Sequence, residues 1–547
     1  MHWQTRLVRA GIRGIHSQAL PTRNRAGLST LGLAGSAFLA GSTLWALHRE
    51  ENIIHSDAAA QLPVQSSISA VSEVRNSDTL QTLVWGSNRS NTLDGSSVEA
   101  LRTPTIASWL DGVALRDLVV HKDHAACVDA NGDVYQWGRG HSNLDKPNLT
   151  LRNKNIIQVQ ATESRLYALS AAGRIYCLEA NSVKQERQPG ISPPPSSSWL
   201  WAEDNKIDFV EVTPATSLGR RESFKSISAG DHHLLAVTSS GRTFAHPIDQ
   251  YANAYGQLGF RKIRIPQPGS TSTIPAQLVP KTLTEKSVAV AETTENWTKD
   301  SIRFCPYIFE IPALVDVPVA QATAGGRSSF ALTTSGRILG WGANDYGQIG
   351  LGGNVTLDTI TVPTEVILKR SVAKCTNVSA GGDLTSFMVR NATDNSVDIL
   401  MCGNGQWGGL GNNVFSNAQA TPTRARGIGA LTEYDEGKGK VVPIVPRAIS
   451  VSATGHVLMT LDTSRGQRVG RDLYTWGKNY DSELGNGRKS SQPMPNPLSV
   501  GDDRVILDSQ RRARVLDLQG RVWGKNVAVE QTALAGYNNS FVYWKLS

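Results

Sequence analysis

The sequence has few of the residues and motifs on which metal, cofactor and covalent chemistry depend. It has only five cysteines in 547 residues, and no two of them form a Cys-x-x-Cys pair: Cys127, Cys177, Cys305, Cys375 and Cys402. Zinc ribbons and thioredoxin-like sites therefore have no support, and buried, unreactive thiols are expected. No phosphate-binding loop, Gly-x-Ser-x-Gly elbow or His-Glu-x-x-His motif occurs. The sequence predicts no enzyme, no catalytic, cofactor-binding or metal-binding residues, and no cofactor.

Charge of one sign is also scarce outside the N-terminal segment. The chain holds 55 Lys and Arg against 47 Asp and Glu, a formal net charge of +8. Six of the arginines and no acid lie in residues 1–49. Without those six, 49 basic residues face 47 acidic ones, so the rest of the chain is nearly neutral. A broad basic face for DNA is therefore not expected.

Residues 1–25 have the composition of a mitochondrial transit peptide. Arg6, Arg9 and Arg13 recur at three- and four-residue spacing with apolar residues between them, and the first acid is Glu50. On a helix this spacing places basic side chains on one face and apolar ones on another. Arg-rich, acid-free amphipathic segments are typical of import into mitochondria.

Residues 26–47 contain no charged side chain. As a helix these 22 residues would span about 33 Å, which matches a bilayer core of about 30 Å. We therefore predict a single transmembrane helix in the mitochondrial inner membrane, followed by a linker over 48–79. Arginines before the span favour a matrix-side N-terminus, but the asymmetry is small, and the side that carries the rest of the chain stays open.

The remainder, 80–547, is built from a repeated unit. Each unit opens with a turn of small residues, continues with an alternating strand and a turn at glycine, and ends in a second strand that closes with Trp-Gly or a relic of it. Two apolar runs joined by such a turn predict a hairpin. Seven openings occur, at Val120, Ala161, Ala229, Ala324, Ala380, Ala453 and Ala535. Hairpins that bury each other by radial stacking predict an all-β, seven-bladed β-propeller.

The two ends of the repeat region complement each other. Trp85-Gly86 has no opening before it, and the opening at Ala535 has no Trp-Gly after it. We therefore expect the ends to form one blade together, which closes the ring and removes exposed sheet edges. A further half-unit, LDLQGRVWG, ends at Gly524, too close to Gly536 for a full blade, and is interpreted as an inserted hairpin. An eight-bladed ring is the alternative.

The unit AGGRSSFALTTSGRILGWGANDYGQIGLG from Ala324 resembles the repeat of the regulator of chromosome condensation family. Three further motifs carry the resemblance: YGQLG at Tyr255–Gly259, YGQIG at Tyr346–Gly350 and GQWGGLG at Gly405–Gly411. It covers about residues 80–547 and implies a propeller that binds other proteins. Two units depart from it, with Cys177-Leu178 and Ala245-His246 in place of Trp-Gly.

Three insertions enlarge the ring. The spacing between openings grows from 41 residues, between 121 and 162, to about 95, between 230 and 325. The excess falls at about 183–221, 247–319 and 412–447, in stretches rich in Pro, Ser and charged residues. Such stretches predict loops, and loops on a rigid scaffold are where binding is concentrated.

The polar and aromatic residues that could suggest chemistry all lie at repeat positions. His233 occupies the slot of His124 in another unit, so His232-His233 is interpreted as a structural pair rather than a metal ligand or base. The same reasoning assigns the repeated tryptophans to blade packing: Trp85, Trp137, Trp341 and Trp476. It also assigns Asp345, Tyr346 and Gln348 to a recurring turn.

Together, the leader, the span and the repeats are similar to fungal mitochondrial inner-membrane members of the family, which are implicated in assembly of respiratory complex III. The resemblance implies a membrane-tethered scaffold whose partners are subunits or assembly factors of a respiratory complex. Because the founding nuclear member of the family acts on the Ran GTPase, a guanine-nucleotide exchange factor or regulator of a mitochondrial GTPase is the alternative, as is a mitochondrial ribosome assembly factor.

Overall fold

The computed structural model describes residues 79–547, with gaps at 97, 145, 187–206, 267–272, 285–300, 369–372, 436–438 and 466–467. These residues lie in one compact unit, Ile68–Ser547. The transit peptide and membrane span predicted at 1–25 and 26–47 lie outside the described residues, as does the linker apart from residue 79. Within the described part of the chain, no helix combines the length and apolarity needed to cross a bilayer.

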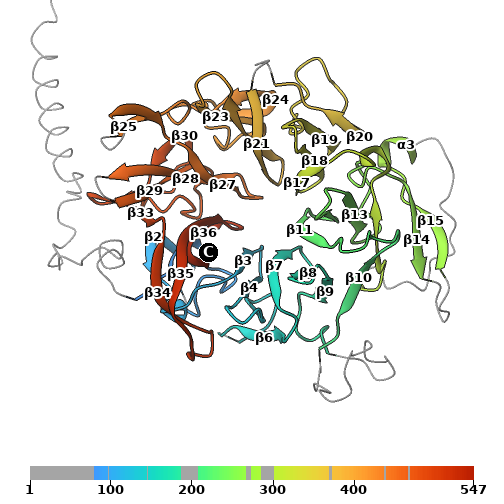
Figure 1. Cartoon of the computed structure of the whole chain (residues 1–547), viewed down its shortest axis with the longest axis horizontal. Coiled ribbons are helices and arrows are strands. Elements are labelled where there is room, and N and C mark those ends of the chain that lie inside the picture. The colour runs from blue at the N-terminus through green and yellow to red at the C-terminus, as the bar shows by residue number, and fades with distance from the viewer. Residues whose placement is uncertain are drawn as a thin grey trace, which may run out of the picture. The chain divides into compact units, whose positions relative to one another are not determined.

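The described chain is an all-β propeller, whose sheets follow one another around a ring (Figure 1). The closing sheet has the order β2 (Ala100–Ile106), β1 (Leu83–Ser87), β36 (Asn539–Leu546), β35 (Val522–Ala535) and β34 (Arg511–Leu516). The next sheet holds β3 (Asp117–Val120), β4 (Ala125–Val128), β5 (Val134–Trp137) and β6 (Asn148–Leu151).

An eight-stranded sheet follows, made of two four-stranded halves that meet where β10 and β16 pair in parallel. Its first half is β7 (Ile156–Ala161), β8 (Arg165–Ser170), β9 (Ile175–Glu179) and β10 (Val210–Pro214). Its second half is β11 (Phe224–Ala229), β12 (His233–Thr238), β13 (Thr243–Pro247) and β16 (Tyr307–Glu310).

Three antiparallel sheets complete the ring. The first is β17 (Val319–Ala324), β18 (Ser328–Thr333), β19 (Ile338–Ala343) and β20 (Thr359–Glu365). The second is β21 (Ala373–Gly381), β22 (Leu384–Asn391), β23 (Val397–Gly405) and β24 (Ser416–Arg424). The third is β27 (Pro446–Val451), β28 (His456–Arg465), β29 (Arg468–Gly477) and β30 (Gln492–Pro497), with β33 (Ile506–Asp508) added at β29.

Small elements decorate the ring. Two-stranded hairpins are formed by β14 (Lys262–Pro266) with β15 (Thr273–Gln277), β25 (Thr432–Asp435) with β26 (Lys440–Pro443), and β31 (Ser499–Val500) with β32 (Asp503–Arg504). The short helical turns are η2 (Ser108–Leu110), α3 (Lys281–Thr284) and η4 (Pro312–Leu314).

One backbone hydrogen bond recurs in seven groups of four or five strands when the two halves of the eight-stranded sheet are counted separately. In each group an N–H at or just after the end of the third strand donates to a carbonyl in the opening turn between the first two strands. The accepting carbonyls belong to Asp123, Ser164, His232, Arg327, Asp383, Gly455 and Asn538, at 2.7–3.1 Å. The opening turns and the loops after the third strands therefore lie at one end of the ring, which we call the opening face. The glycine turns after the second strands lie at the other end, the turn face.

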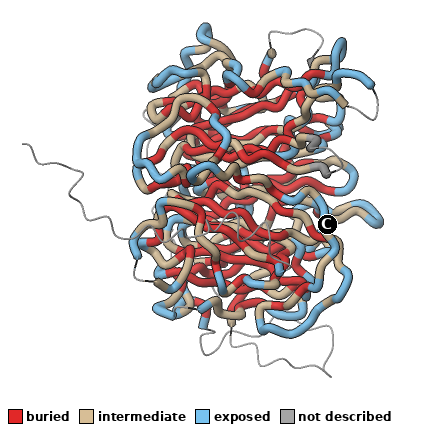
Figure 2. Tube along the Cα trace, turned by 90° about the vertical axis from the view of Figure 1, so that its left-hand side faces the viewer, coloured by how far each residue is buried: buried red, intermediate tan, exposed pale blue. Residues whose placement is uncertain are grey.

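The hydrophobic core lies between neighbouring sheets rather than in a single centre. Phe330 of β18 and Phe387 of β22, for example, meet edge-to-face with ring centroids 6.0 Å apart. The second strand of most groups, such as β12 or β18, is buried along its whole length because both faces of the sheet are covered. Figure 2 shows these buried strands inside the ring, with exposed residues gathered towards its edges.

The predicted closure of the ring by its two ends is present in the strand pairing. Leu83, Val84 and Gly86 of β1 pair with Val542, Phe541 and Asn539 of β36. The half-unit before Gly524 forms a hairpin, β34 with the first part of β35, that extends the closing sheet beyond the turn face.

The prediction that the three insertions are loops is wrong in part. The strands β10, β16 and β24 lie in the intervals 183–221, 247–319 and 412–447, and each is the fourth strand of its group. These are outer strands with weak sequence signals: β10 (VEVTP) and β16 (YIFE) span only five and four residues, and β24 (SNAQATPTR) has no large apolar residue. The hairpins β14–β15 and β25–β26 lie in the same intervals.

Candidate interaction surface

The repeated tryptophans pack between neighbouring groups of strands. Each indole N–H donates to a backbone carbonyl of a neighbouring group: Trp85 to Glu483 at 2.8 Å, Trp137 to Thr92 at 2.9 Å, Trp341 to Gln257 at 2.8 Å and Trp476 to Gly409 at 2.9 Å. All four side chains are buried. Where Cys402 replaces tryptophan, its thiol lies 3.3 Å from the Gln348 carbonyl and takes the same place. None of these indoles is available to stack on a ligand.

Histidines at the first position of the second strand also connect neighbouring sheets. His233 is fully buried, and its Nε2 lies 2.8 Å from Oγ of Ser329 in the next sheet. His456 repeats this contact with Ser540 at 3.2 Å. Burial lowers the pKa of both histidines to about 3, so both are neutral at physiological pH. His232, in contrast, pairs with Asp249 at 2.7 Å, and this hydrogen bond raises its pKa.

Ion pairs link the opening turns around the opening face. The Arg327 guanidinium lies 3.1 Å from both Asp345 and Asp383, and its carbon is 4.6 Å from the centre of the Tyr255 ring. Gln348 donates to Asp383 at 3.2 Å and accepts from the Tyr346 N–H at 3.0 Å. The predicted turn residues Asp345, Tyr346 and Gln348 therefore hold this face together.

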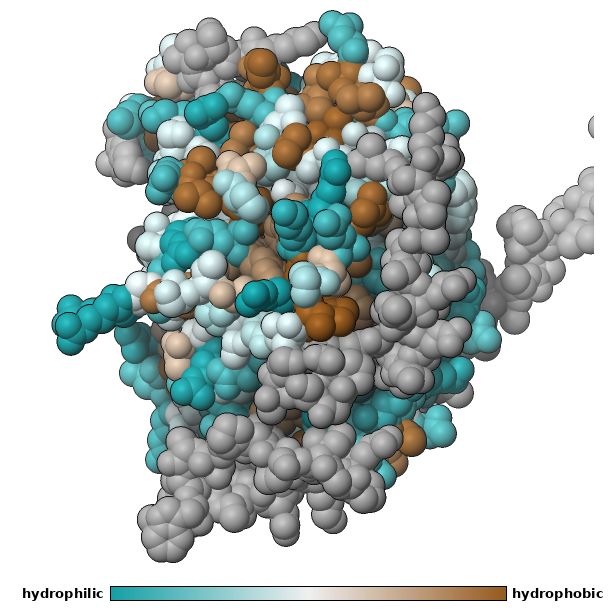
Figure 3. Space-filling view, turned by 90° about the vertical axis from the view of Figure 1, so that its right-hand side faces the viewer, coloured by the Kyte–Doolittle hydropathy of each residue, from teal (hydrophilic) through white to brown (hydrophobic). Residues whose placement is uncertain are grey.

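Apolar side chains project from the loops of the same face. The loop after the third strand exposes at least one large apolar residue in every group, with 48–77% of its surface accessible: Val98, Leu144, Val183, Tyr251, Leu357, Val414, Phe415 and Tyr480. Isolated exposed apolar residues are ordinary on a protein surface. Their recurrence around one end, between charged opening turns, gives the mixture of apolar and polar contacts found in protein–protein interfaces. Apolar groups interspersed with polar ones also lie on the side of the ring shown in Figure 3.

Two further features lie away from the opening face. An open cavity of about 680 Å³ is lined by Leu351, Ile367, Leu368 and Leu400 and by the ion-paired Asp398 and Arg424. On the turn face, the β34–β35 hairpin exposes Arg512, Arg514 and Lys525 beside Val522 and Trp523. Either feature offers a second surface for a protein partner.

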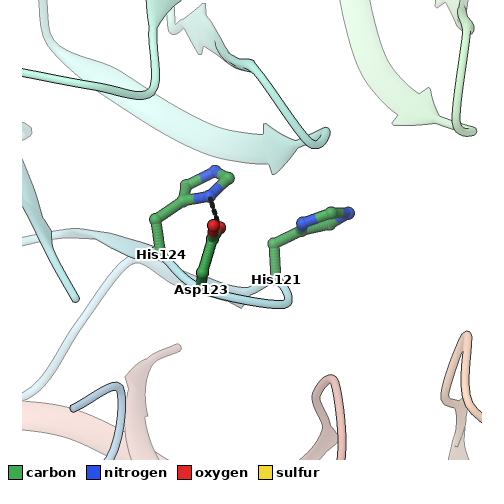
Figure 4. Close-up of side chains that lie close together, drawn as sticks. All are labelled: His121, Asp123 and His124. Atoms are coloured by element: carbon green, nitrogen blue, oxygen red, sulfur yellow. Dashed lines mark hydrogen bonds and ion pairs between the residues drawn. The ribbon is translucent and has the colours of Figure 1, made fainter. Parts of the chain in front are cut away.

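One cluster of possible metal ligands was missed by the sequence reasoning. His121, Asp123 and His124, in the opening turn between β3 and β4, each place a ligand atom within 4.8 Å of the others (Figure 4). Nδ1 of His124 lies 3.2 Å from the Asp123 carboxylate. The available signal was His121 itself, because four of the other openings have glycine at this position and two have a hydroxyl residue.

Comparison with known proteins identifies the class of β-propeller to which the fold is similar. Residues 335–388 and 319–348 match models of the Regulator of chromosome condensation (RCC1) repeat. The chain is thus an RCC1-like β-propeller protein, as the sequence motifs predicted.

Among individual proteins, the chain is similar to "Protein FMP25, mitochondrial" of Saccharomyces cerevisiae, at 22% identity over 85% of this chain and 72% of that protein. It is also similar to the ultraviolet-B receptor UVR8 of Arabidopsis thaliana, at 27% identity over 50% of this chain and 63% of the receptor, less than two thirds of its length. The crystal structure of Prp20p from Saccharomyces cerevisiae covers 88% of this chain and 95% of its own, with a TM-score of 0.53 and 15% identity, and supports the fold alone.

Proposed function

We propose that this protein is a non-enzymatic scaffold of the mitochondrial inner membrane, which assists assembly of a respiratory complex, complex III first, through contacts made by its opening face. The proposal rests on the different roles of the repeat residues and the loop residues in the ring. Repeat residues pack between sheets, whereas the loops of one face repeatedly expose apolar side chains. A surface of this kind suits a protein partner rather than a small substrate.

Location in the mitochondrion is inferred from two independent features. The chain is similar over most of its length to a yeast protein named as mitochondrial, and residues 1–25 have the composition of a transit peptide. The single-pass span at 26–47 is retained as part of the proposal. Each of these groups of four or five strands is taken as one blade, which makes a ring of seven.

The place where the ring begins is compatible with a tether. Thr79 precedes β1, and Ser547 follows β36, so both ends of the ring leave the closing sheet at the turn face. A tether through the preceding residues would therefore join the ring at the end opposite to the opening face.

The proposal is tested by capture from detergent-solubilised mitochondria with the full chain as bait. Complex III subunits or assembly factors are expected in the eluate. Replacing Leu144, Phe415 and Tyr480 by Ser should abolish their capture, because these side chains protrude from three different loops of the opening face.

The matched control replaces Val522 and Trp523 by Ser, two similarly exposed residues on the turn-face hairpin. This variant should capture the same proteins as the unchanged chain. Normal complex III in cells that lack the protein, or equal capture by both variants, would refute the proposal.

Regulation of a mitochondrial GTPase is the second candidate, and the β34–β35 hairpin is the observation that favours it. A projecting hairpin with an exposed tryptophan is a suitable element for insertion into a partner. Faster nucleotide release from a mitochondrial GTPase, lost in the variant with Ser at 522 and 523, would support this function instead.

A further inference from the structure

The opening turn between β3 and β4 brings two imidazoles and a carboxylate together. His121, Asp123 and His124 all project from this four-residue turn (Figure 4), with ligand atoms within 4.8 Å of one another. The two imidazole rings have centroids 5.4 Å apart. Nδ1 of His121 is buried and has no hydrogen-bond partner among the described residues. A buried polar atom without a partner calls for a water or an ion beside it.

This turn differs from the equivalent turns of the same chain. His121 stands where four other openings carry glycine (Gly230, Gly325, Gly381 and Gly536) and two carry a hydroxyl residue (Thr162 and Ser452), so an imidazole at this position departs from the repeat. Packing of the sheets does not require this side chain, because other turns form the same backbone bond with glycine.

His124 differs from the equivalent histidines in its hydrogen-bond partner. His233 and His456, in the same slot, are held through Nε2 by Ser329 and Ser540 of the next sheet. For His124 the equivalent residue of the next sheet is Leu166, which has no hydroxyl, and Nε2 of His124 has no partner within the described structure. Its ring is instead turned towards Asp123, at 3.2 Å.

We propose that His121, Asp123 and His124 bind one divalent transition-metal ion, such as Zn²⁺, on the opening face next to the innermost strand of their sheet. Imidazole nitrogens select Zn²⁺ and similar ions over Ca²⁺ and Mg²⁺, which prefer all-oxygen sites. With metal–ligand bonds of about 2.0–2.1 Å, tetrahedral ligands lie about 3.3 Å apart. Asp123 and His124 already meet this separation at 3.2 Å, whereas the His121 ring, whose ligand atom lies within 4.8 Å of the other two, must move closer when the ion binds.

The surroundings tolerate a cation and leave it accessible. Lys122, the basic residue of the same turn, is largely exposed and pairs with Glu163 at 3.9 Å, which partly neutralises its charge. The Asp123 side chain is 45% exposed, so water can complete the coordination. The His121 ring also lies 5.8 Å from that of Tyr537 in the closing sheet. A bound ion would therefore stiffen the opening face where the closing sheet meets the β3–β6 sheet.

The test is isothermal titration of the purified full chain with ZnCl₂ as the only ligand. One saturable site per chain is expected. His121→Gly, the residue of other openings, and Asp123→Asn should each weaken that site at least about tenfold. Both changes preserve the backbone turn, and circular dichroism and the thermal midpoint without metal verify that the variants fold.

His232→Asn is the matched control, because His232 sits with Asp249 in the equivalent turn of another sheet. It should leave Zn²⁺ affinity unchanged. Replacement of Zn²⁺ by Co²⁺ should give visible absorption bands that disappear in His121→Gly. Absence of a saturable site, affinity unchanged in His121→Gly, or equal loss in the control would overturn the proposal.

Discussion

Acid should destabilise the ring through its buried histidines, and His233→Asn provides the sharpest measurement. The unfolded chain binds a proton at this imidazole near pH 6.5, whereas burial lowers the folded pKa to about 3. Between these values the unfolded state carries the extra proton, so stability is full above pH 6.5 and falls as the pH drops towards 3. Each pH unit in this window removes about 1.4 kcal/mol, so His233 should cost about 2 kcal/mol between pH 6.5 and 5.0.

Asparagine is the matched replacement, since Asn539 occupies the same slot in the closing sheet. Equilibrium unfolding in urea, followed by tryptophan fluorescence at pH 7.0 and 5.0, gives the loss of stability for each protein. Buried acids whose pKa is raised by desolvation, such as Asp117 and Glu483, act in the opposite direction, but they are common to both proteins and cancel. His233→Asn should lose about 2 kcal/mol less on acidification than the unchanged chain.

His232→Asn supplies a contrast of opposite sign. The hydrogen bond to Asp249 raises the pKa of His232, so its contribution is present below pH 6.5 and is lost as the pH rises through the folded value. This variant should therefore be no less sensitive to acid than the unchanged chain. If His233→Asn and the unchanged chain lose the same stability between pH 7.0 and 5.0, the neutral, buried state assigned to His233 is wrong.

Three further predictions follow from packing. Trp476→Phe removes the indole N–H that donates to the Gly409 carbonyl and should cost about 1–3 kcal/mol by urea unfolding, whereas exposed Trp523→Phe should stay within about 0.5 kcal/mol. Gly342→Ala should lower the urea midpoint by the equivalent of at least about 2 kcal/mol, because φ is +104° and the new Cβ would lie 2.6 Å from the Arg327 carbonyl. Gly353→Ala, with open space around it, should be near neutral. All five cysteines are buried and free, so Ellman's reagent should detect none in the folded protein at pH 7.5 and five after unfolding; rapid native reaction of even one thiol would contradict their burial.

The central strands could be predicted from sequence because their signals are local. Alternating apolar residues, a glycine turn and a Trp-Gly closure are all contained within about twenty residues, as in β18 and β19. The closure of β1 on β36 could be predicted because an incomplete unit at each end requires it. The seam between β10 and β16 could not, since parallel pairing of two outer strands from different groups leaves no local pattern.

The candidate surface could be predicted only in outline. Loops of a rigid scaffold are the expected place for binding, but which loop residues are exposed depends on how neighbouring groups cover them. Tyr255 illustrates this: it shares the YGQ motif and partial burial with Tyr346, and its ring lies against the Arg327 guanidinium of the next sheet. The motif specifies the turn, and the neighbouring sheet decides what the side chain contacts.

In a repeat protein, equivalent positions of different repeats can be compared to separate residues needed for packing from residues with another role. A change at a repeat position is structural when the neighbouring group compensates, as where Cys402 takes the place of tryptophan and its thiol still meets the Gln348 carbonyl. A change without compensation is different: Leu166 removes the hydroxyl that His124 would use, and His121 adds an imidazole whose Nδ1 has no partner in the described part of the ring. These two departures lie in adjacent sheets and act on the same turn. Packing accounts for Cys402 but leaves Nδ1 of His121 without a partner among the described residues, so this turn, rather than the positions of the repeated tryptophans, is the candidate for a bound ion.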